Sequence, residues 1–210
     1  LDLAFDLFDQ IVIARGAMGT FLRELDKVRP HQPTQVESAK RAMINFNNPK
    51  VKTLENRTVA EDSVFVKGIS QDLQQLLSDA KRNDGIVIVS PPIYKAGSDL
   101  GETVDAKPFA RYICGIHELI DFLIEEGEIV RDHTFGDTAA AIAGKERWEN
   151  CARPDRNKPV YLDDLSADCL DRLELFPLVE RIFPQIVIHE STKAQATALI
   201  EHTEYQGQVE

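Results

Sequence analysis

Two adjacent acids that directly follow an apolar run are the residues best suited to chemistry in this sequence. Asp163 and Asp164 come after the run PVYL at 159–162, which predicts a short buried strand. Acids at that position stand at the carboxyl edge of a parallel sheet, where ligands usually bind. They could hold Mg²⁺ or Mn²⁺, which favour oxygen ligands, and the cation could activate water against a phosphodiester. The alternative is that the pair caps the helix beginning at Leu165.

A second apolar run, IVI at 186–188, is followed by His189, Glu190 and Ser191. If both runs are strands of one parallel sheet, Glu190 lies at the same edge and is a further candidate metal ligand. In the alternative interpretation, Ser191 caps the next helix and Glu190 is solvated. The histidines show no short metal-ligand spacing, so we expect each to be a surface residue or a hydrogen-bonded interior one.

Basic residues gather just before the run at 159–162. Lys145, Arg147, Arg153, Arg156 and Lys158 form the one local basic enrichment of a chain whose 24 Lys+Arg and 35 Asp+Glu give a net charge of −11. Such a chain repels phosphates overall, so nucleic acid would need a local basic surface or bridging cations. We expect Arg153, Arg156 and Lys158 to guide a phosphate backbone toward the acidic edge. A solvated linker is the alternative.

Other clusters carry weaker signals. Asp99, Glu102 and Asp105 share a loop that lacks the ligand spacing of a calcium loop, so it is either an exposed acidic loop or an irregular cation site. The glycines at 16 and 19 follow an apolar run but lack the phosphate-loop ending. The serines lie outside any G-x-S-x-G elbow, so serine hydrolase chemistry has no support.

Composition and cysteine usage point to a cytoplasmic globular protein. With 43% hydrophobic and 28% charged residues, the chain is neither disordered nor fibrous. Its apolar runs are far shorter than the roughly 20 residues of a membrane helix, and the amino-terminal sequence lacks a signal peptide's basic opening. Three widely spaced cysteines without a C-x-x-C pair suggest neither zinc nor a redox motif.

Helical and strand-like segments alternate along the chain. Apolar runs predict interior strands at 11–13, 86–89, 160–162 and 186–188, because a strand covered on both faces is apolar throughout. Apolar spacings of three and four residues predict helices around 36–46, 69–80, 113–124, 138–143, 165–173 and 192–200. This alternation predicts an α/β fold, a parallel sheet flanked by helices.

The segments suggest an α/β unit at 1–130 with a polar insertion at about 30–65, a linker at 131–158 and a second half-unit at 159–210. Residues 175–200 echo residues 1–25, which suggests two half-related units. The alternative is that any two helix–strand–helix stretches look alike. The chain begins without Met, so we expect a piece of a longer protein with flanking domains.

The segment PVYLDDLS at 159–166, followed by IVIHES at 186–191, resembles the PIN-domain proteins, in particular the long variants of multidomain bacterial proteins. The segments at 72–90 and 113–126 also resemble parts of that family. The resemblance implies a parallel α/β sheet and an acidic cluster that binds Mg²⁺ or Mn²⁺ and usually cuts RNA. Asp163 matches the family's first-strand metal-binding acid, and Asp164 is its neighbour.

Three departures separate this sequence from that family pattern. Gln195 stands where the family usually has a Glu, Glu24 is the nearest acid in the corresponding amino-terminal helix, and no later strand with distal acids follows residue 191. Two expectations therefore remain. In the first, the chain is a metal-dependent endoribonuclease-type module, either active or inactive as presented. In the second, it is a non-catalytic interaction or scaffold module. At least three carboxylates should converge around Asp163 in the nuclease-type module, and they should diverge in the scaffold module.

Overall fold

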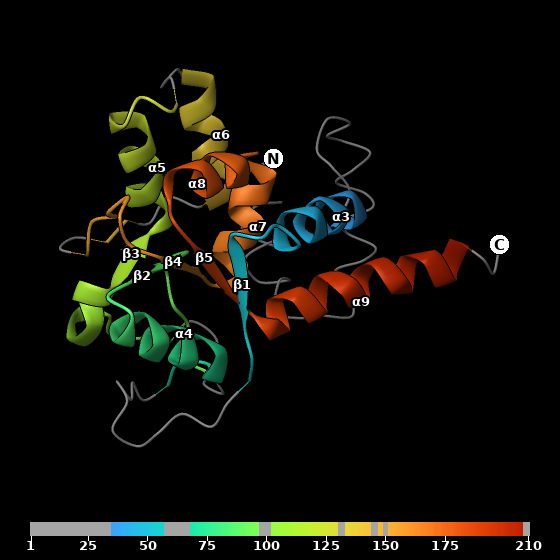
Figure 1. The fold of residues 1–210 in the computed structure, drawn as a ribbon, viewed down its shortest axis with the longest axis horizontal. Coiled ribbons are helices and arrows are strands. Elements are labelled where there is room, and N and C mark those ends of the chain that lie inside the picture. The colour runs from blue at the N-terminus through green and yellow to red at the C-terminus, as the bar shows by residue number, and fades with distance from the viewer. Residues whose placement is uncertain are drawn as a thin grey trace. The chain divides into compact units, whose positions relative to one another are not determined.

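The computed structural model describes residues 35–56, 68–96, 102–129, 133–143, 147–148 and 151–207. The expected strand at 11–13 and the glycines at 16 and 19 lie outside these residues. The described residues form a five-stranded sheet in the order β1-β5-β4-β2-β3, and every strand pairs parallel with its neighbour (Figure 1). The strands are β1 (Val51–Leu54), β2 (Ile86–Val89), β3 (Ile113–Gly115), β4 (Val160–Leu162) and β5 (Ile186–His189). The predicted α/β class is confirmed.

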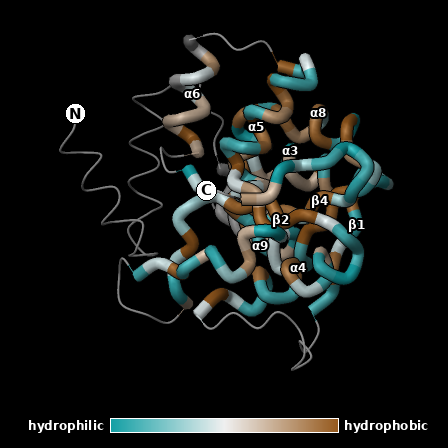
Figure 2. The backbone as a smooth tube through the Cα atoms, turned by 90° about the vertical axis from the view of Figure 1, so that its left-hand side faces the viewer, coloured by the Kyte–Doolittle hydropathy of each residue, from teal (hydrophilic) through white to brown (hydrophobic). Residues whose placement is uncertain are grey.

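The inner strands are short, apolar and buried along their whole length. Every residue of β2, β4 and β5 is buried, as expected for strands covered on both faces. In Figure 2, β2 and β4 are among the hydrophobic parts of the tube. The edge strand β1, with the sequence VKTL, buries only Leu54. The expected interior strands at 86–89, 160–162 and 186–188 are therefore confirmed.

Helices cover both faces of the sheet (Figure 1). On one face, α4 (Gln71–Arg82) and the 3₁₀ helix η1 (Lys107–Tyr112) pack against Val87, Tyr161 and Val187. On the other face, four helices pack against Ile88, Leu162 and Ile188. They are α5 (Ile116–Glu125), α6 (His133–Ala143), α7 (Asp164–Arg172) and α8 (Phe176–Ile182). The remaining described helices are α3 (Gln35–Phe46) and α9 (Glu190–Gly207).

Three elements differ from the sequence-based expectation. Strand β1 lies inside the expected polar insertion. Its sequence VKTL contains no continuous apolar run that would predict a strand, because an edge strand is only partly buried. The first three residues of the expected helix at 113–124 form strand β3 instead. This strand ends at Gly115, which is also the N-cap of α5. The expected linker contains α6, which is longer than the helical turn predicted at 138–143.

The strands at the centre of the sheet come from the carboxyl-terminal part of the chain. Strands β4 and β5 lie between β1 and β2, within one compact unit at Val36–Glu210. The two strands of the expected half-unit, β4 and β5, therefore pair in one sheet with β1 and β2. Within the described residues, no helix is both long and apolar enough to cross a bilayer.

Candidate site at the carboxyl edge of the sheet

Asp163 lies at the carboxyl end of β4, the middle strand of the sheet. Its backbone N–H donates to the carbonyl of Ile88 on β2 at 3.3 Å. Its side chain is the N-cap of α7 and accepts a hydrogen bond from the backbone N–H of Ser166 at 2.7 Å. The capping alternative thus describes the observed contact, because this carboxylate satisfies a helix-terminal N–H. The predicted position at the sheet edge is also confirmed.

The surroundings of Asp163 disfavour its charge. Burial raises the pKa of the carboxyl from 3.8 to about 7, and the neighbouring Asp164 adds to the increase. Hydrogen bonds from Ser166 and from the backbone of Ser90 oppose the increase by stabilising the carboxylate. The group therefore titrates near neutral pH. A titrating carboxyl at the carboxyl edge of a parallel sheet, where ligands usually bind, is a typical feature of functional sites.

The other two predicted metal ligands are arranged differently. Asp164 is exposed, and its Oδ1 accepts from the Leu165 N–H at 3.0 Å. Glu190 is the first residue of α9 and is half-buried. Within the part of the chain that the structure describes, no group of three or more His, Cys, Asp or Glu residues could hold a metal ion. The convergence of carboxylates expected of a nuclease centre is thus missing from the described residues.

A polar network that the sequence analysis missed lies at the end of β5. His189 is 1% exposed, with its Nε2 3.0 Å from Gln75 Oε1 on α4 and its Nδ1 2.8 Å from Ser191 Oγ. The Ser191 hydroxyl donates to Asp72 Oδ2 at 2.5 Å. Gln75 in turn donates from Nε2 to Asn56 Oδ1 at 2.9 Å. The network joins the end of β5 to the first turns of α4.

This network resembles a serine triad in composition but not in arrangement. Because the Gln75 carbonyl oxygen can only accept, His189 Nε2 donates to it. Nδ1 lies 2.8 Å from Ser191 Oγ and 3.2 Å from the Ser191 backbone nitrogen, and its role toward them depends on its protonation. The Ser191 hydroxyl points to a carboxylate, whereas a nucleophile needs a base that takes its proton. His189 is therefore a hydrogen-bonded interior histidine, as expected. Ser191 is not a helix N-cap, because α9 already begins at Glu190.

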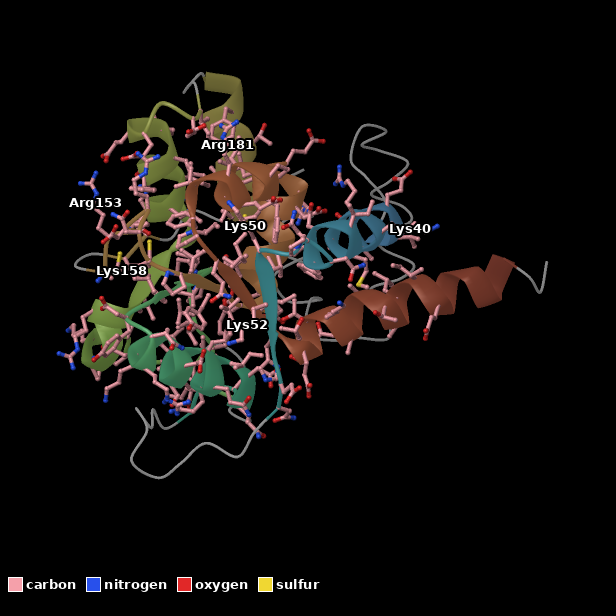
Figure 3. All side chains as sticks on the ribbon, viewed as in Figure 1. Lys40, Lys50, Lys52, Arg153, Lys158 and Arg181 are labelled. Carbon is pink, nitrogen blue, oxygen red and sulfur yellow. The ribbon has the colours of Figure 1, made fainter. Side chains whose placement is uncertain are left out.

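The predicted nucleic-acid-binding cations lie in ion pairs away from the acidic edge. Arg153 pairs with Glu125 at the end of α5, and Figure 3 shows it on that side of the sheet. Arg156 pairs with Glu126 at 3.2 Å, and Lys158 pairs with Asp84 at 2.8 Å.

Asp84 precedes β2 and Lys158 precedes β4, so this pair marks the amino edge of the sheet. Lys158 and Asp163 therefore lie at opposite ends of β4. Arg147 likewise pairs with Asp121 at 2.6 Å, while Lys145 lies outside the described residues. The contribution of Arg153, Arg156 and Lys158 to RNA binding stays a prediction.

In the acidic loop, Glu102 pairs with Lys95 at 2.9 Å. Asp105 Oδ1 accepts from the Lys107 N–H at 3.1 Å, at the start of η1. Asp99 lies outside the described residues. The two described acids therefore have local structural partners, as expected of an exposed loop.

Comparison of the chain with protein-family models, with curated proteins and with solved structures found no match.

Proposed function

We propose that the chain is a PIN-like, ribonuclease-type module that binds one Mg²⁺ or Mn²⁺ weakly through Asp163 and does not cleave RNA unaided. The observation that carries the proposal is the position of Asp163, a titrating carboxyl at the carboxyl end of the middle strand. Ligands of parallel α/β sheets bind at that edge. Magnesium often uses only one or two protein carboxylates and completes its shell with water and phosphate oxygens.

The residues do not fit a pair of cations. Two-cation cleavage needs ligands that hold one ion near the attacking oxygen and another near the leaving oxygen. No group of three candidate ligands exists among the described residues, and Gln195 supplies a neutral side chain. We therefore infer binding of a single ion and derive no cleavage step.

The second candidate is a non-catalytic interaction module in which Asp163 only caps α7. The short hydrogen bond from the Ser166 N–H to Asp163 supports it. Asn caps helices about as well as Asp but brings no charge to a cation. Asp163→Asn therefore preserves the capping role and removes the proposed ligand.

The test is a calorimetric titration of the 210-residue chain with Mn²⁺. We expect weak binding that Asp163→Asn abolishes and that Asp168→Asn, an exposed change on the same helix, preserves. Absence of Mn²⁺ binding in the unaltered chain, or equal binding by Asp163→Asn, would favour the interaction module. Rapid Mg²⁺-dependent cleavage of RNA would contradict the second half of the proposal. Replacing Arg153, Arg156 and Lys158 together with Ala should weaken RNA binding and make it less dependent on salt concentration.

A further inference from the structure

Two cysteines that are far apart in the sequence lie side by side at the end of β3. Cys114 is the middle residue of β3 and is fully buried, and Cys151 is half-buried. The backbone next to Cys151 is anchored to the same place, because the Ala152 N–H donates to the carbonyls of Ala110 at 2.9 Å and Ile113 at 2.8 Å. These bonds hold residue 151 against β3.

The Cys114 thiol has two acceptors within reach. One is the carbonyl oxygen of Gly115, 3.3 Å from Cys114 Sγ, and the other is the sulfur of Cys151. Cys151 also accepts from the backbone N–H of Gly115, the N-cap of α5. The positive end of a helix stabilises a thiolate, so Cys151 stands where its anionic form is favoured.

The two thiols differ in charge state and in access. Hydrogen bonds from Cys114 and from the Gly115 backbone lower the pKa of Cys151 to about 6, against the opposing effects of burial and of the Glu118 carboxylate. The hydrogen bond to Cys151 and burial raise the pKa of Cys114 well above its usual value. Of the two cysteines, the half-buried Cys151 is therefore the one whose thiolate, the nucleophilic form, is favoured, and the buried Cys114 is the one that keeps its proton.

We propose that Cys151 and Cys114 form a thiol–disulfide exchange site that reacts with low-molecular-weight disulfides such as glutathione disulfide. The Cys151 thiolate attacks one glutathione sulfur, and one glutathione thiolate leaves. Cys114 then attacks the Cys151 sulfur, and its proton passes to the departing thiolate, so the second glutathione leaves as a thiol. The two cysteines are oxidised to one intramolecular disulfide, and glutathione disulfide is reduced to two thiols. This site is separate from Asp163 and does not depend on the proposed function.

The resulting bridge has a definite place in the fold. It would join β3 to the segment before β4 and close the part of the chain that contains α5 and α6. The hydrogen-bonded sulfurs need to approach to about 2 Å to form the bond. Since the Ala152 bonds already hold the two segments together, oxidation requires only a local change.

The experiment uses the reduced 210-residue chain in glutathione buffers, followed by alkylation and peptide mapping by mass spectrometry. We expect a Cys114–Cys151 disulfide in the unaltered chain. Cys114→Ser should stop the reaction at a glutathione adduct on Cys151, because the attacking second thiol is missing. Cys169→Ser is the matched control, since Cys169 is buried and its pKa is raised to about 12. It should behave like the unaltered chain.

Alkylation rates of the cysteines in the unaltered chain provide a second measurement. At pH 7, Cys151 of the unaltered chain should be alkylated at least ~10-fold faster than Cys169, because the thiolate is the reactive form. Glu118→Gln should shift the pH dependence of Cys151 alkylation to lower pH, since it removes a negative charge that raises the pKa of this thiol. A persistent glutathione adduct in the unaltered chain, no reaction, or equal rates at Cys151 and Cys169 would each overturn the proposal.

Discussion

Replacing Asp163 with Asn should change how the stability of the protein depends on pH. The folded protein holds the Asp163 proton more tightly than the unfolded chain, because its pKa is raised from 3.8 to about 7. Stability from this source is fully present below pH 3.8, falls as the pH rises, and levels off above about pH 7. A tenfold difference in proton affinity is worth about 1.4 kcal/mol. Ionisation of Asp163 therefore removes as much as about 4 kcal/mol from the free energy of unfolding.

Urea denaturation measures this effect, with the single Trp148, which packs against the core, as a fluorescence reporter. Asn cannot ionise and still caps α7, so Asp163→Asn should gain stability relative to the unaltered chain between pH 4 and pH 8. Asp168 and Asp171 also have raised pKa values, but both proteins retain them and their effects cancel. A stability difference that is the same at every pH would refute the assignment of the shift to Asp163.

Two further variants test the packing between α4 and β4. Tyr161→Phe removes the hydroxyl that donates to Asp79 Oδ2 at 3.0 Å and accepts from Asn83 Nδ2 at 3.0 Å. Urea denaturation should show a free energy of unfolding that is lower by about 1–2 kcal/mol. The control Tyr94→Phe, at an exposed tyrosine, should not change it. Gly85→Ala would bring a methyl group to 2.5 Å from the Tyr161 ring and 2.9 Å from the Pro159 carbonyl, so thermal melts should show a loss of about 1–3 kcal/mol. Gly136→Ala, whose new methyl group meets nothing within 4 Å in α6, should be neutral or stabilising, and equal effects of the two glycine changes would contradict the contact argument.

The sequence shows the inner strands clearly because their burial leaves few polar positions. Residues 86–89, 160–162 and 186–188 are apolar throughout, and all became strands. The strand at 51–54 has two polar side chains because it lies at an edge. The strand at 113–115 is continuous with the apolar stripe of α5, so periodicity alone cannot separate strand from helix there.

The sequence predicts the place of a candidate site residue only when that place depends on a single strand. Asp163 could be placed at the sheet edge because its position depends on β4 alone. The contact between Ser191 and Asp72 joins residues 119 positions apart, and the contact between Cys114 and Cys151 depends on the backbone bonds of Ala152. No local spacing carries such information. Which distant residues come into contact depends on the order of the strands and on how the loops are held, and both are known only from the folded structure.

The order of the strands has a consequence for biosynthesis. As the chain leaves the ribosome, β2 and β3 emerge in succession and can pair with each other at once. Strand β1 emerges before both, yet its partner in the sheet is β5, the last of the described strands along the chain. Until residues 186–189 are synthesised, the nascent chain carries β1, and after residue 162 also β4, without their partner β5. Unpaired strand edges promote association between chains, so chaperones would be needed most in that interval.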